Sequence, residues 1–434
     1  MTTSLGGAVY DISDIPPRRV AVLGQGYVGL PVAIRAVEVG FDVIGFDIDK
    51  ARIDRLRKAE TFIDDITDGD LVIAVSTGRY LPTDDPAALA GFDVAVVCVP
   101  TPWRDGAPDL SCVEDAAAII APHVTPGCCV ILESTSYPGT TEEIFIPILE
   151  AGSGLCAGEQ FHVGYSPERI DPGNKTWRID NTPKIIAGVN QTSLQALADF
   201  YGRLVEHTVP VPGLREAELA KLLENTFRHV NIALVNELAM YCHALGLDVW
   251  SVVDAAATKP FGFMTFMPGP GVGGHCLPID PSYLSWQARR SLGHGLRFVD
   301  MANDVNDHMP DYVVSRVVTH LNQQRMAVKG SRILLVGLAY KGNSRDTRKS
   351  PAITVAQQLD DLGANLRAID PLIDVDEIPS YIRMVPCESA QITGADLVIV
   401  LADHDAIDWE LFEQHAERVL DTRNRLRSQF ATRL

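Results

Sequence analysis

Cysteine is scarce in this chain of 434 residues, and its spacing excludes two kinds of structure. The eight cysteines stand at positions 98, 112, 128, 129, 156, 242, 276 and 387. They form no Cys-x-x-Cys pair and no regular framework, so we expect neither disulfides nor structural zinc. His275 beside Cys276 does not alter this expectation, because adjacent residues seldom converge on one ion. We therefore expect no metal, and a reducing compartment, the cytoplasm.

Basic residues and long apolar runs are also in short supply. The chain has 37 Lys and Arg against 56 Asp and Glu, and the net charge of -19 argues against nucleic acid or an anionic membrane as the main partner. No stretch reaches the roughly 18–20 apolar residues of a membrane span, and we expect no secretory signal in Met1 to Arg19. With 46% hydrophobic residues, the chain is long enough for two or three globular domains.

Close to its start the chain has the pattern of a dinucleotide-binding unit. A short apolar strand at residues 19–23 leads directly into Gly24-Gln25-Gly26-Tyr27-Val28-Gly29, which is followed by a helical pattern at 30–39. A second strand at 41–46 ends at Asp47. The order of strand, GxGxxG, helix, strand and acid is the dinucleotide fingerprint in its structural context.

Each residue of the fingerprint has a physical task. Gly24 allows the tight turn, Gly26 lets the backbone approach a pyrophosphate, and Gly29 lets the helix pack on the strand. The helix N-terminus supplies amide donors to the phosphates. Asp47 can accept hydrogen bonds from both ribose hydroxyls and repels a 2′-phosphate, which favours NAD over NADP.

More strand–helix units follow. Apolar runs at 94–99 and 130–132 end near Thr101 and Thr135, and continuous apolar strands between helices predict a parallel sheet covered on both faces. Ligands lie at the carboxyl ends of such strands, although each threonine taken alone could be a helix cap. Glu168 follows a further short strand, where it could be a general base or a solvated charge.

From about Leu214 to Leu245 glycine and proline almost disappear. Apolar residues recur with helical spacing, at positions 219, 222, 223, 227, 230, 234, 235 and 238, which predicts an amphipathic helix too long for an ordinary surface element. We expect this helix to join the domains and to form a dimer contact. Lys221 and Asn225 lie four residues apart and so point to one face, although Lys221 taken alone could be a solvated charge.

A glycine-rich stretch precedes Cys276. Four of the six residues 269–274 are glycine, which suits a backbone that approaches a ligand closely or takes positive φ. A thiol over such a loop is a candidate nucleophile, and Asp280 follows four residues later. Most cysteines are simply buried, so these residues alone leave both interpretations open.

The last part of the chain repeats the strand–turn–helix pattern in a weaker form. A buried strand at 332–336 leads into the GxAxxG stretch 337–342, a helix at 351–362 and a strand ending at Asp370. The pattern predicts a second, smaller Rossmann-like unit without an intact cofactor site. Its loop gathers basic residues at positions 341, 345 and 348, which suits a phosphate-bearing ligand in so acidic a chain. A basic helix start without a ligand is the alternative.

Several long motifs stand in the order found in one family. They are GQGYVGLP at 24–31, VPTP at 99–102, EST at 133–135, SPER at 166–169, LAKLLENTFRHVNIALVNE at 219–237, GGHCLPIDP at 273–281 and GLAYKGNSRDTRKSP at 337–351. Together they resemble the UDP-sugar 6-dehydrogenases. The resemblance implies an α/β fold with two Rossmann-like doubly wound domains joined by a long central helix that carries a homodimer interface. It implies an NAD-binding domain at 1–212, a central helical region with the cysteine loop at 213–310 and a UDP-sugar-binding domain at 311–434.

The resemblance also implies the chemistry. Oxidation of a primary alcohol to a carboxylate removes two hydrides, so two NAD molecules act in turn. A cysteine traps the intermediate aldehyde as a thiohemiacetal, which loses the second hydride to give a thioester. By resemblance Cys276 is this nucleophile, and Lys221 and Asn225 stabilise the oxyanion. Asp280 works with an ordered water whose other partner is Thr135, and Glu168 activates water for hydrolysis.

The predicted contacts fall into two groups by ligand. Those to NAD are Gly24, Gly26, Tyr27, Val28, Gly29, Asp47, Arg52, Thr101, Thr135 and Arg348. Those to the UDP-sugar are Glu168, Arg169, Lys221, Asn225, Phe266, Gly273, Lys341 and Arg423.

The sequences around the site also bear on the sugar. Residues 259–271 and the Ser-Pro-Glu-Arg at 166–169 look like the 2-acetamido branch of the family. UDP-glucose enzymes usually have a second acid where this chain has Pro172, and a basic residue ahead of the cysteine loop, for which Lys259 is the nearest match. UDP-N-acetylglucosamine is therefore the first expectation, with UDP-N-acetylmannosamine, a galacto epimer and UDP-glucose as alternatives.

Two other kinds of protein need fewer of these residues. A non-catalytic NAD-binding redox sensor needs only the first Rossmann unit and the thiol, and it leaves Lys221, Asn225 and the second basic loop unexplained. A one-step 2-hydroxyacid-type dehydrogenase needs no nucleophilic cysteine.

Overall fold

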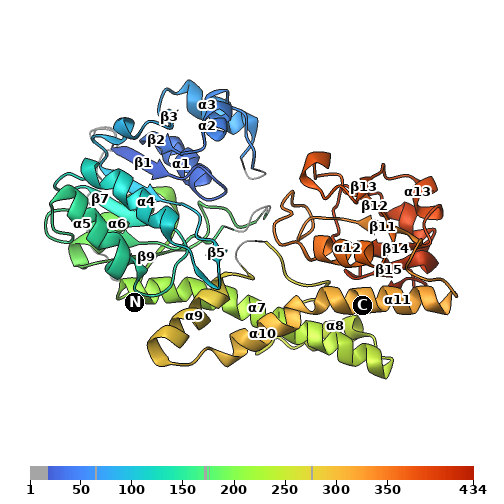
Figure 1. The fold of residues 1–434 in the computed structure, drawn as a ribbon. Coiled ribbons are helices and arrows are strands. Elements are labelled where there is room, and N and C mark those ends of the chain that lie inside the picture. The colour runs from blue at the N-terminus through green and yellow to red at the C-terminus, as the bar shows by residue number, and fades with distance from the viewer. Residues whose placement is uncertain (1–17, 64–65, 171–173, 175, 275–276) are drawn as a thin grey trace. The chain divides into compact units, whose positions relative to one another are not determined.

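The computed structural model describes residues 18–63, 66–170, 174, 176–274 and 277–434. These residues form two compact units. Unit 1 contains the described part of Met1–Thr101 together with Leu110–Glu218, and unit 2 contains Pro102–Asp109 together with the described part of Leu219–Leu434. Figure 1 labels many of the helices and strands of both units.

Unit 1 is built on one mostly parallel sheet, with strand order β10-β9-β8-β7-β4-β1-β2-β3. Its strands are β1 (Arg19–Leu23), β2 (Asp42–Phe46), β3 (Tyr80–Thr83), β4 (Val94–Val97), β7 (Cys129–Leu132), β8 (His162–Tyr165), β9 (Lys184–Gly188) and β10 (Thr208–Pro210). The strands from β3 to β8 in this order are all parallel to their neighbours. Counted along the chain, they follow the order 3-2-1-4-5-6 of a dinucleotide-binding Rossmann fold. The predicted α/β class is confirmed.

The helices of unit 1 bury the sheet from both sides. They are α1 (Gly29–Glu38), α2 (Lys50–Arg57), α3 (Asp68–Ser76), α4 (Ser111–Ile120), α5 (Ile146–Ser153) and α6 (Gln191–Leu204). α1 and α6 share a core with Val20 and Val22 of β1. Since successive side chains of a strand point to opposite faces, the equally buried Ala21 faces the other side of the sheet. Burial on both faces explains why these strands are continuous apolar runs in the sequence.

β9 departs from the predicted parallel arrangement. It pairs antiparallel with β8, with Gly164 opposite Gly188 and Tyr165 opposite Ala187. Parallel neighbours need a crossover connection, usually a helix, and the described residues between β8 and β9 form no helix. As a result Lys184, the first residue of β9, lies at the edge of the sheet where β8 ends.

Unit 2 contains a six-stranded parallel sheet of order β13-β12-β11-β14-β15-β16. The strands are β11 (Arg332–Val336), β12 (Asn365–Ile369), β13 (Arg383–Met384), β14 (Leu397–Val400), β15 (Val419–Asp421) and β16 (Thr432–Arg433). Every neighbouring pair in this order is parallel, and the strands again follow the order 3-2-1-4-5-6. The predicted second Rossmann-like unit is confirmed.

Only some of the helices of unit 2 were predicted from the sequence. They are α8 (Val249–Ala257), α9 (Asp280–Leu292), α10 (Arg297–Asp307), α11 (Met309–Gln323), α12 (Pro351–Asp361), α13 (Ser389–Thr393) and α14 (Trp409–Glu413). Helices α8, α10, α13 and α14 were not predicted. In α10 the apolar residues blur the helical period, because Val299 and Ala302 are buried while Phe298 and Met301 are exposed.

α7 (Leu214–Leu245) is the long helix that the sequence predicts, with the predicted ends and 32 residues. At 1.5 Å per residue it is about 48 Å long. The boundary between the two units falls within it, between Glu218 and Leu219. Glu218 is fully buried and accepts hydrogen bonds from the backbone N–H groups of Gly139 (2.6 Å) and Thr141 (2.9 Å). The start of the helix is therefore tied to unit 1.

The helical spacing of the apolar residues of α7 had suggested that they all face the core, but only some of them do. Leu222 and Val235 are buried, whereas Leu223 is 61% exposed and Leu234 is 60% exposed. The exposed apolar side chains recur at positions 219, 223, 227, 234, 241 and 245. At 100° per residue these positions fall within an arc of about 80° around the helix. We call this exposed set the α7 stripe.

A short hairpin, β5 (Trp103–Arg104) with β6 (Ala107–Pro108), interrupts unit 1 in sequence but belongs to unit 2 by its contacts. Trp103 stacks on Tyr283 of α9, with the ring centroids 5.8 Å apart. The Tyr283 hydroxyl donates to the carbonyl oxygen of Pro102 at 3.1 Å. The chain that leaves the carboxyl end of β4 is thus anchored on α9, the helix that begins at Asp280.

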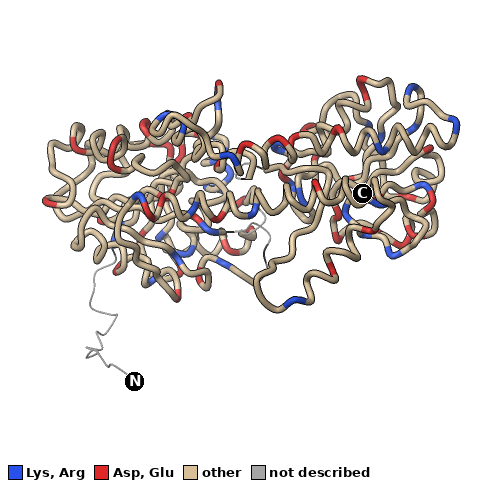
Figure 2. Tube along the Cα trace, turned by 90° about the horizontal axis from the view of Figure 1, so that it is seen from below, with Lys and Arg blue, Asp and Glu red and all other residues tan. Residues whose placement is uncertain are grey.

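Charge is distributed along the whole described chain. Figure 2 shows acidic and basic residues interspersed in both units, so the net charge of -19 is not confined to one segment. Among the helices that the structure describes, none combines the length and the apolarity needed to cross a bilayer.

Candidate active site

The loop after β1 has the geometry that binding a pyrophosphate requires. Gly24 has φ +89°, and a Cβ placed on it would lie 2.4 Å from the carbonyl oxygen of Cys98. A Cβ on Gly29 would lie 1.8 Å from the carbonyl oxygen of Gly24, whereas one on Gly26 would meet no described atom within 4 Å. The two outer glycines therefore make room for the protein itself. Gly26 faces open space beside the N-terminus of α1, where phosphate oxygens are bound in this fold.

Asp47 follows β2 at the same edge of the sheet and is almost fully buried. Its Oδ2 accepts from the backbone N–H of Gln25 (2.7 Å) and from Nη1 of Arg52 (2.7 Å), and its Oδ1 accepts from the N–H of Asp49 (2.9 Å). A carboxylate oxygen has two acceptor positions, so by this count Oδ1 keeps one for a ribose hydroxyl. The residues present fit an adenine dinucleotide.

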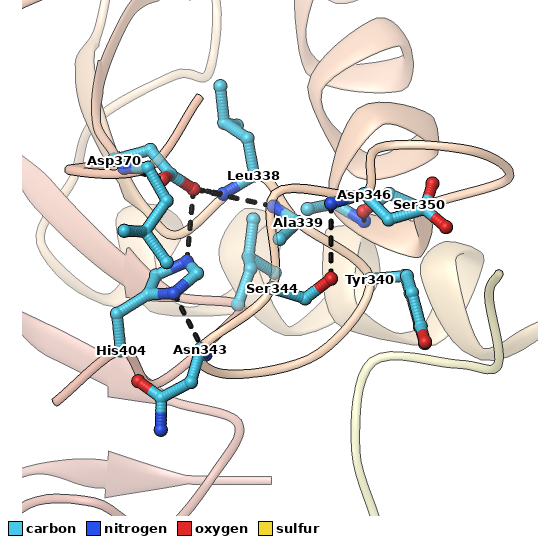
Figure 3. A network of polar contacts seen from close by, with 12 residues as sticks. Leu338, Ala339, Tyr340, Asn343, Ser344, Asp346, Ser350, Asp370 and His404 are labelled. Atoms are coloured by element: carbon cyan, nitrogen blue, oxygen red, sulfur yellow. Dashed lines mark hydrogen bonds and ion pairs between the residues drawn. The ribbon is translucent and has the colours of Figure 1, made fainter. Parts of the chain in front are cut away.

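The second Rossmann unit uses the equivalent acid differently (Figure 3). Asp370 follows β12 as Asp47 follows β2, and its Oδ2 accepts from the N–H of Leu338 at 2.7 Å. The same oxygen lies 3.1 Å from Nε2 of His404, which has no exposed surface. His404 Nδ1 accepts from the N–H of Asn343 at 3.0 Å, which places the ring proton on Nε2, facing Asp370. Burial would raise the pKa of Asp370, but His404 and the backbone donors outweigh burial and lower it.

In this network His404 takes the position that Arg52 takes in unit 1. Oδ2 of Asp370 meets His404 as Oδ2 of Asp47 meets Arg52. His404 also accepts from the loop after β11, so the buried imidazole ties that loop to the acid. A Cβ on Gly337 would lie 2.2 Å from the carbonyl oxygen of Ala402, so this glycine too makes room for the protein. The units differ at the second position of the motif, where Gly26 meets no described atom within 4 Å and its counterpart Ala339 is buried, which supports the prediction that the GxAxxG stretch is no intact cofactor site.

A buried cluster of charged side chains lies at the edge of unit 1 where β7 and β8 end and β9 begins. We call it the acid–lysine cluster, and its members are Glu133, Glu168, Lys184 and Tyr201. Lys184 Nζ lies 3.1 Å from Oε1 of Glu133 and 3.3 Å from Oε2 of Glu168. The Tyr201 hydroxyl, from α6, donates to Oε1 of Glu133.

The electrostatics of this cluster follow from burial and from its charge count. Burial raises the pKa of Glu133, and the Glu168 carboxylate raises it further, against the opposing effect of Lys184. Burial would lower the pKa of Lys184, but the two carboxyl groups outweigh burial and raise it. Burial and the nearby carboxyl group of Glu133 also raise the pKa of Tyr201 and of Cys98, whose Sγ lies 3.7 Å from Oε2 of Glu133. Lys184 is therefore an ammonium ion shared by two carboxyl groups.

In unit 2 the structure brings three predicted catalytic side chains together. Asn225 Nδ2 donates to Oδ2 of Asp280 at 2.6 Å, and Lys221 lies one turn earlier on α7. All three are buried. Burial raises the pKa of Asp280 to about 6, although the charge of Lys221 and the hydrogen bond from Asn225 lower it. Asp280 is thus a carboxylate at neutral pH that protonates in mild acid.

The glycine-rich stretch 269–274 is held against other parts of unit 2, while His275 and Cys276 lie outside the described residues. The Gly269 N–H donates to Oδ1 of Asn236 at 2.9 Å, and the Gly274 N–H donates to the carbonyl oxygen of Arg348 at 2.9 Å. A Cβ on Gly273 would lie 2.6 Å from the carbonyl oxygen of Lys349. At Gly273 and Gly274 the close approach expected to a ligand is instead an approach to the protein's own loop after β11. Positive φ occurs here as expected, at Gly271 and Gly274.

The other predicted contacts in unit 1 lie in the loops at the carboxyl edge of its sheet. Thr101 is buried, while Tyr27, Val28 and Thr135 are half-buried. Arg169 follows Glu168, and its Nη1 donates to the carbonyl oxygen of Pro183 at 2.7 Å.

The predicted contacts in unit 2 lie on several loops. The ring of Phe266 packs edge-on against Phe227 of α7, with centroids 5.7 Å apart. Arg423 Nε donates to the carbonyl oxygen of Leu401 at 2.8 Å. Lys341 Nζ lies 5.9 Å from the centroid of the preceding Tyr340 ring. Arg348, whose predicted partner is NAD, is paired with Asp346 at 2.6 Å.

Sequence reasoning gave no role to Lys184, Tyr201 or His404, and it quoted Glu133 only as part of a motif. Lys184 is the first residue of β9, which is buried over its first four residues. A lysine at the start of an apolar strand could have indicated a buried charge. Tyr201 lies within an ordinary amphipathic helix and His404 in a short loop, so neither offers a signal in the sequence.

Three parts of the chain match one family. Residues 18–205 match the NAD binding domain of the UDP-glucose/GDP-mannose dehydrogenase family, residues 215–308 its central domain and residues 334–428 its UDP binding domain. The resemblance expected from the sequence motifs is therefore confirmed, as is NAD as the cofactor.

Relatives named for different substrates are similar to this chain over nearly its whole length. A UDP-N-acetyl-D-glucosamine 6-dehydrogenase of Pseudomonas aeruginosa is 36% identical, over 89% of this chain and 90% of its own. A UDP-N-acetyl-D-mannosamine dehydrogenase of Pyrococcus horikoshii is 34% identical, over 94% and 95% respectively. Among solved structures, UDP-D-ManNAc dehydrogenase from P. horikoshii has a TM-score of 0.84 at 33% identity, covering 94% of this chain and 95% of that one.

The pairing of Asp47 with Arg52 predicts a change of cofactor preference. In Asp47→Ser the acid that accepts from a ribose is lost, and Arg52 is released to receive a 2′-phosphate. We expect the ratio of kcat/KM for NAD to that for NADP to fall by about 10–100-fold, the worth of a charged hydrogen bond. The double variant Asp47→Ser/Arg52→Ala is the control. Its kcat/KM for NAD should fall without a rise in its kcat/KM for NADP. An unchanged ratio in Asp47→Ser would contradict this assignment.

Proposed function

Since the chain belongs to the UDP-glucose/GDP-mannose dehydrogenase family and is an NAD-dependent oxidoreductase acting on a UDP-sugar, we propose that it oxidises C6 of a 2-acetamido UDP-sugar to the carboxylate. UDP-N-acetylglucosamine is our first choice of substrate. The reaction removes four electrons and consumes two NAD for each sugar. The observation that carries the mechanism is the buried contact of Asn225 with Asp280 beside Lys221.

The choice of sugar is supported by the relatives. A P. aeruginosa relative is named for UDP-N-acetyl-D-glucosamine and a P. horikoshii relative for UDP-N-acetyl-D-mannosamine. Both names carry the 2-acetamido group that the sequence around the site favours. UDP-N-acetylmannosamine is therefore the second candidate, ahead of a galacto epimer and UDP-glucose.

In the first oxidation the C6 hydroxyl must lose a proton as well as a hydride. Asp280 is ionised above about pH 6, and in our proposal it accepts this proton through a water whose other partner is Thr135. Asn225 holds the carboxylate in place with one N–H of its amide. An amide nitrogen has two N–H donors, so the second is available to an oxyanion.

In the second oxidation the aldehyde is held covalently. Cys276 adds to it, and Lys221 and Asn225 donate to the oxyanion of the thiohemiacetal and later of the thioester hydrolysis intermediate. Two donors on one face of α7 suit this role because a helix fixes their spacing. Glu168 then takes a proton from the water that attacks the thioester.

The loop Gly24–Gly29 and Asp47 would hold NAD, which would supply the acceptor for each hydride. In our proposal Tyr27, Val28, Thr101 and Arg348 complete its contacts and Arg52 orients Asp47. The UDP-sugar is held by Lys341 and Arg423, with Phe266, Gly273 and Arg169 nearer the sugar. Lys341 and Arg423 supply the positive charge that a diphosphate needs.

Counting NADH per sugar tests the proposed reaction directly. Limiting amounts of UDP-N-acetylglucosamine, UDP-N-acetylmannosamine, UDP-N-acetylgalactosamine and UDP-glucose are each incubated with excess NAD, and the end-point absorbance of NADH is measured. We expect two NADH per UDP-N-acetylglucosamine. One NADH per sugar would reject the thioester route, and none with any sugar would favour a redox sensor. The matched control Cys276→Ser should lose turnover while NAD binding is retained.

We also propose that the protein is a homodimer formed through α7, within the three-part division 1–212, 213–310 and 311–434 predicted from the sequence. The α7 stripe supports this, because six exposed apolar side chains on an arc of about 80° form a typical helix-packing surface. A second copy of the same helix would bury the stripe in a two-fold interface.

The stripe predicts the oligomeric state of a double variant. Leu223→Asp/Leu234→Asp places two charges in the proposed interface and should convert the dimer to a monomer, measured as molar mass by light scattering. Leu362→Asp alters an exposed leucine outside the stripe and should leave the dimer intact. A monomeric wild-type protein, or a dimeric double variant, would overturn the proposal.

A further inference from the structure

Lys184 contacts Glu168, the proposed base of thioester hydrolysis, from the buried side of the sheet edge. The residue is only 5% exposed, and its Nζ bridges Oε2 of Glu168 and Oε1 of Glu133. Topology explains the position. Because β9 runs antiparallel to β8, its first residue lies beside the loops that follow β7 and β8, and these loops supply the two acids.

We propose that Lys184, together with Glu133, is a positioning residue for Glu168, keeping its carboxylate ionised and presenting Oε2 to the hydrolytic water. The inference rests on the proposed function, because it concerns the step assigned there to Glu168. Lys184 is not itself a catalytic residue, since it acts through Glu168.

The hydrogen bonds of Glu168 determine which oxygen is available. Its Oε1 accepts from the backbone N–H groups of Arg169 and Ile170, which takes up both acceptor positions of that oxygen. Its Oε2 accepts from Lys184 at 3.3 Å, which takes up one. By this count a water that is to lose a proton to Glu168 binds at Oε2.

The charges of the cluster determine whether Glu168 can be a base. Two carboxyl groups that share one buried site do not both ionise unless a cation lies between them, and here Lys184 is that cation. Burial raises the pKa of Glu133 and so does the neighbouring Glu168 carboxylate, while Lys184 and the hydrogen bond from Tyr201 lower it. The ammonium group lies between the two carboxyl groups and offsets the repulsion between them, so Glu168 can act as a base.

The step itself balances without an oxidant. The water oxygen attacks the thioester carbon, and one of its protons passes to Oε2 of Glu168. The C–S bond breaks, Cys276 leaves as a thiolate, and the sugar carboxyl group is released. Without the ammonium charge the two buried carboxyl groups face each other uncompensated, so Glu168 is a poorer proton acceptor and the step slows.

Two variants that remove neighbouring charges of opposite sign test the proposal. Lys184→Met should slow hydrolysis by about tenfold or more at neutral pH, with a burst of two NADH per site in stopped flow before slow turnover. The rate of the slow phase is measured as a function of pH. The pH at which this rate reaches half its maximum should rise in Lys184→Met and fall in Glu133→Gln. The groups facing Lys184 and Glu133 are Glu168, Tyr201 of α6 and Cys98 after β4, and all are unchanged in both variants. A purely structural role would lower the rate in both variants without moving this pH.

Glu168→Gln separates failure of the inference from failure of the proposed function. If Glu168→Gln turns over like the wild type, the role of Glu168 is wrong and the inference falls with it. If Glu168→Gln gives the burst and slow turnover but Lys184→Met hydrolyses at the wild-type rate, only the positioning role of Lys184 is overturned.

Two further variants keep the test decisive if Lys184→Met does not fold. Lys184→Met/Glu133→Gln leaves Glu168 as the one carboxyl group of the cluster and should regain part of the hydrolysis rate, and Lys184→Arg keeps the charge and should show no burst. Folding is checked by circular dichroism and thermal melting. A Lys184→Arg variant that folds but accumulates two NADH per site would overturn the proposal. A folded double variant would also overturn it if its hydrolysis rate fell below that of Glu133→Gln by the same factor by which the rate of Glu168→Gln falls below that of the wild type.

Discussion

Parallel strands that end at one edge of a sheet are the constraint on which the site of unit 1 depends. The loops after β1, β2, β4, β7 and β8 all leave from that edge and carry, in this order, Gly26, Asp47, Thr101, Thr135 and Glu168. None of these residues is close to the others in sequence. Because β9 runs antiparallel to β8, Lys184 lies at the same edge. One buried cation therefore contacts two acids, which follow the parallel strands β7 and β8.

The two Rossmann units show how one fold serves two purposes. Each has a glycine of positive φ after its first strand and an acid after its second. In unit 1 Asp47 is paired with the partly exposed Arg52 and keeps capacity for a ribose. In unit 2 Asp370 is bonded to the fully buried His404, which locks the loop that carries Lys341. Unit 2 thus keeps the fold of a cofactor-binding unit, while residues 334–428 match a UDP binding domain.

Much of the fold could be predicted from the sequence because its signals are local. α7 and β11 begin and end where glycine, proline and apolar runs place them, and the glycines of the first loop follow from a fixed turn geometry. The direction of β9 could not be predicted, since it depends on the path of an irregular connection. α10 was missed because its apolar residues lie on both sides of the helix. The α7 stripe shows the same limit, because helical spacing identifies apolar residues but not which of them the chain itself covers.

The site shows a similar division. Lys221, Asn225 and Asp280 were found by motif and lie together as expected. Lys184 and His404 were not found, because each acts through a contact with a residue more than ten positions away in the chain.

The central claim, that oxidation proceeds through a thioester on Cys276, is tested most directly by mass spectrometry of the Cys276 peptide. Glu168→Gln, mixed with UDP-N-acetylglucosamine and NAD and quenched in acid after the burst, should yield this peptide with the mass of the sugar acyl group added. An unmodified Cys276 peptide from enzyme that has formed two NADH per site would contradict the account.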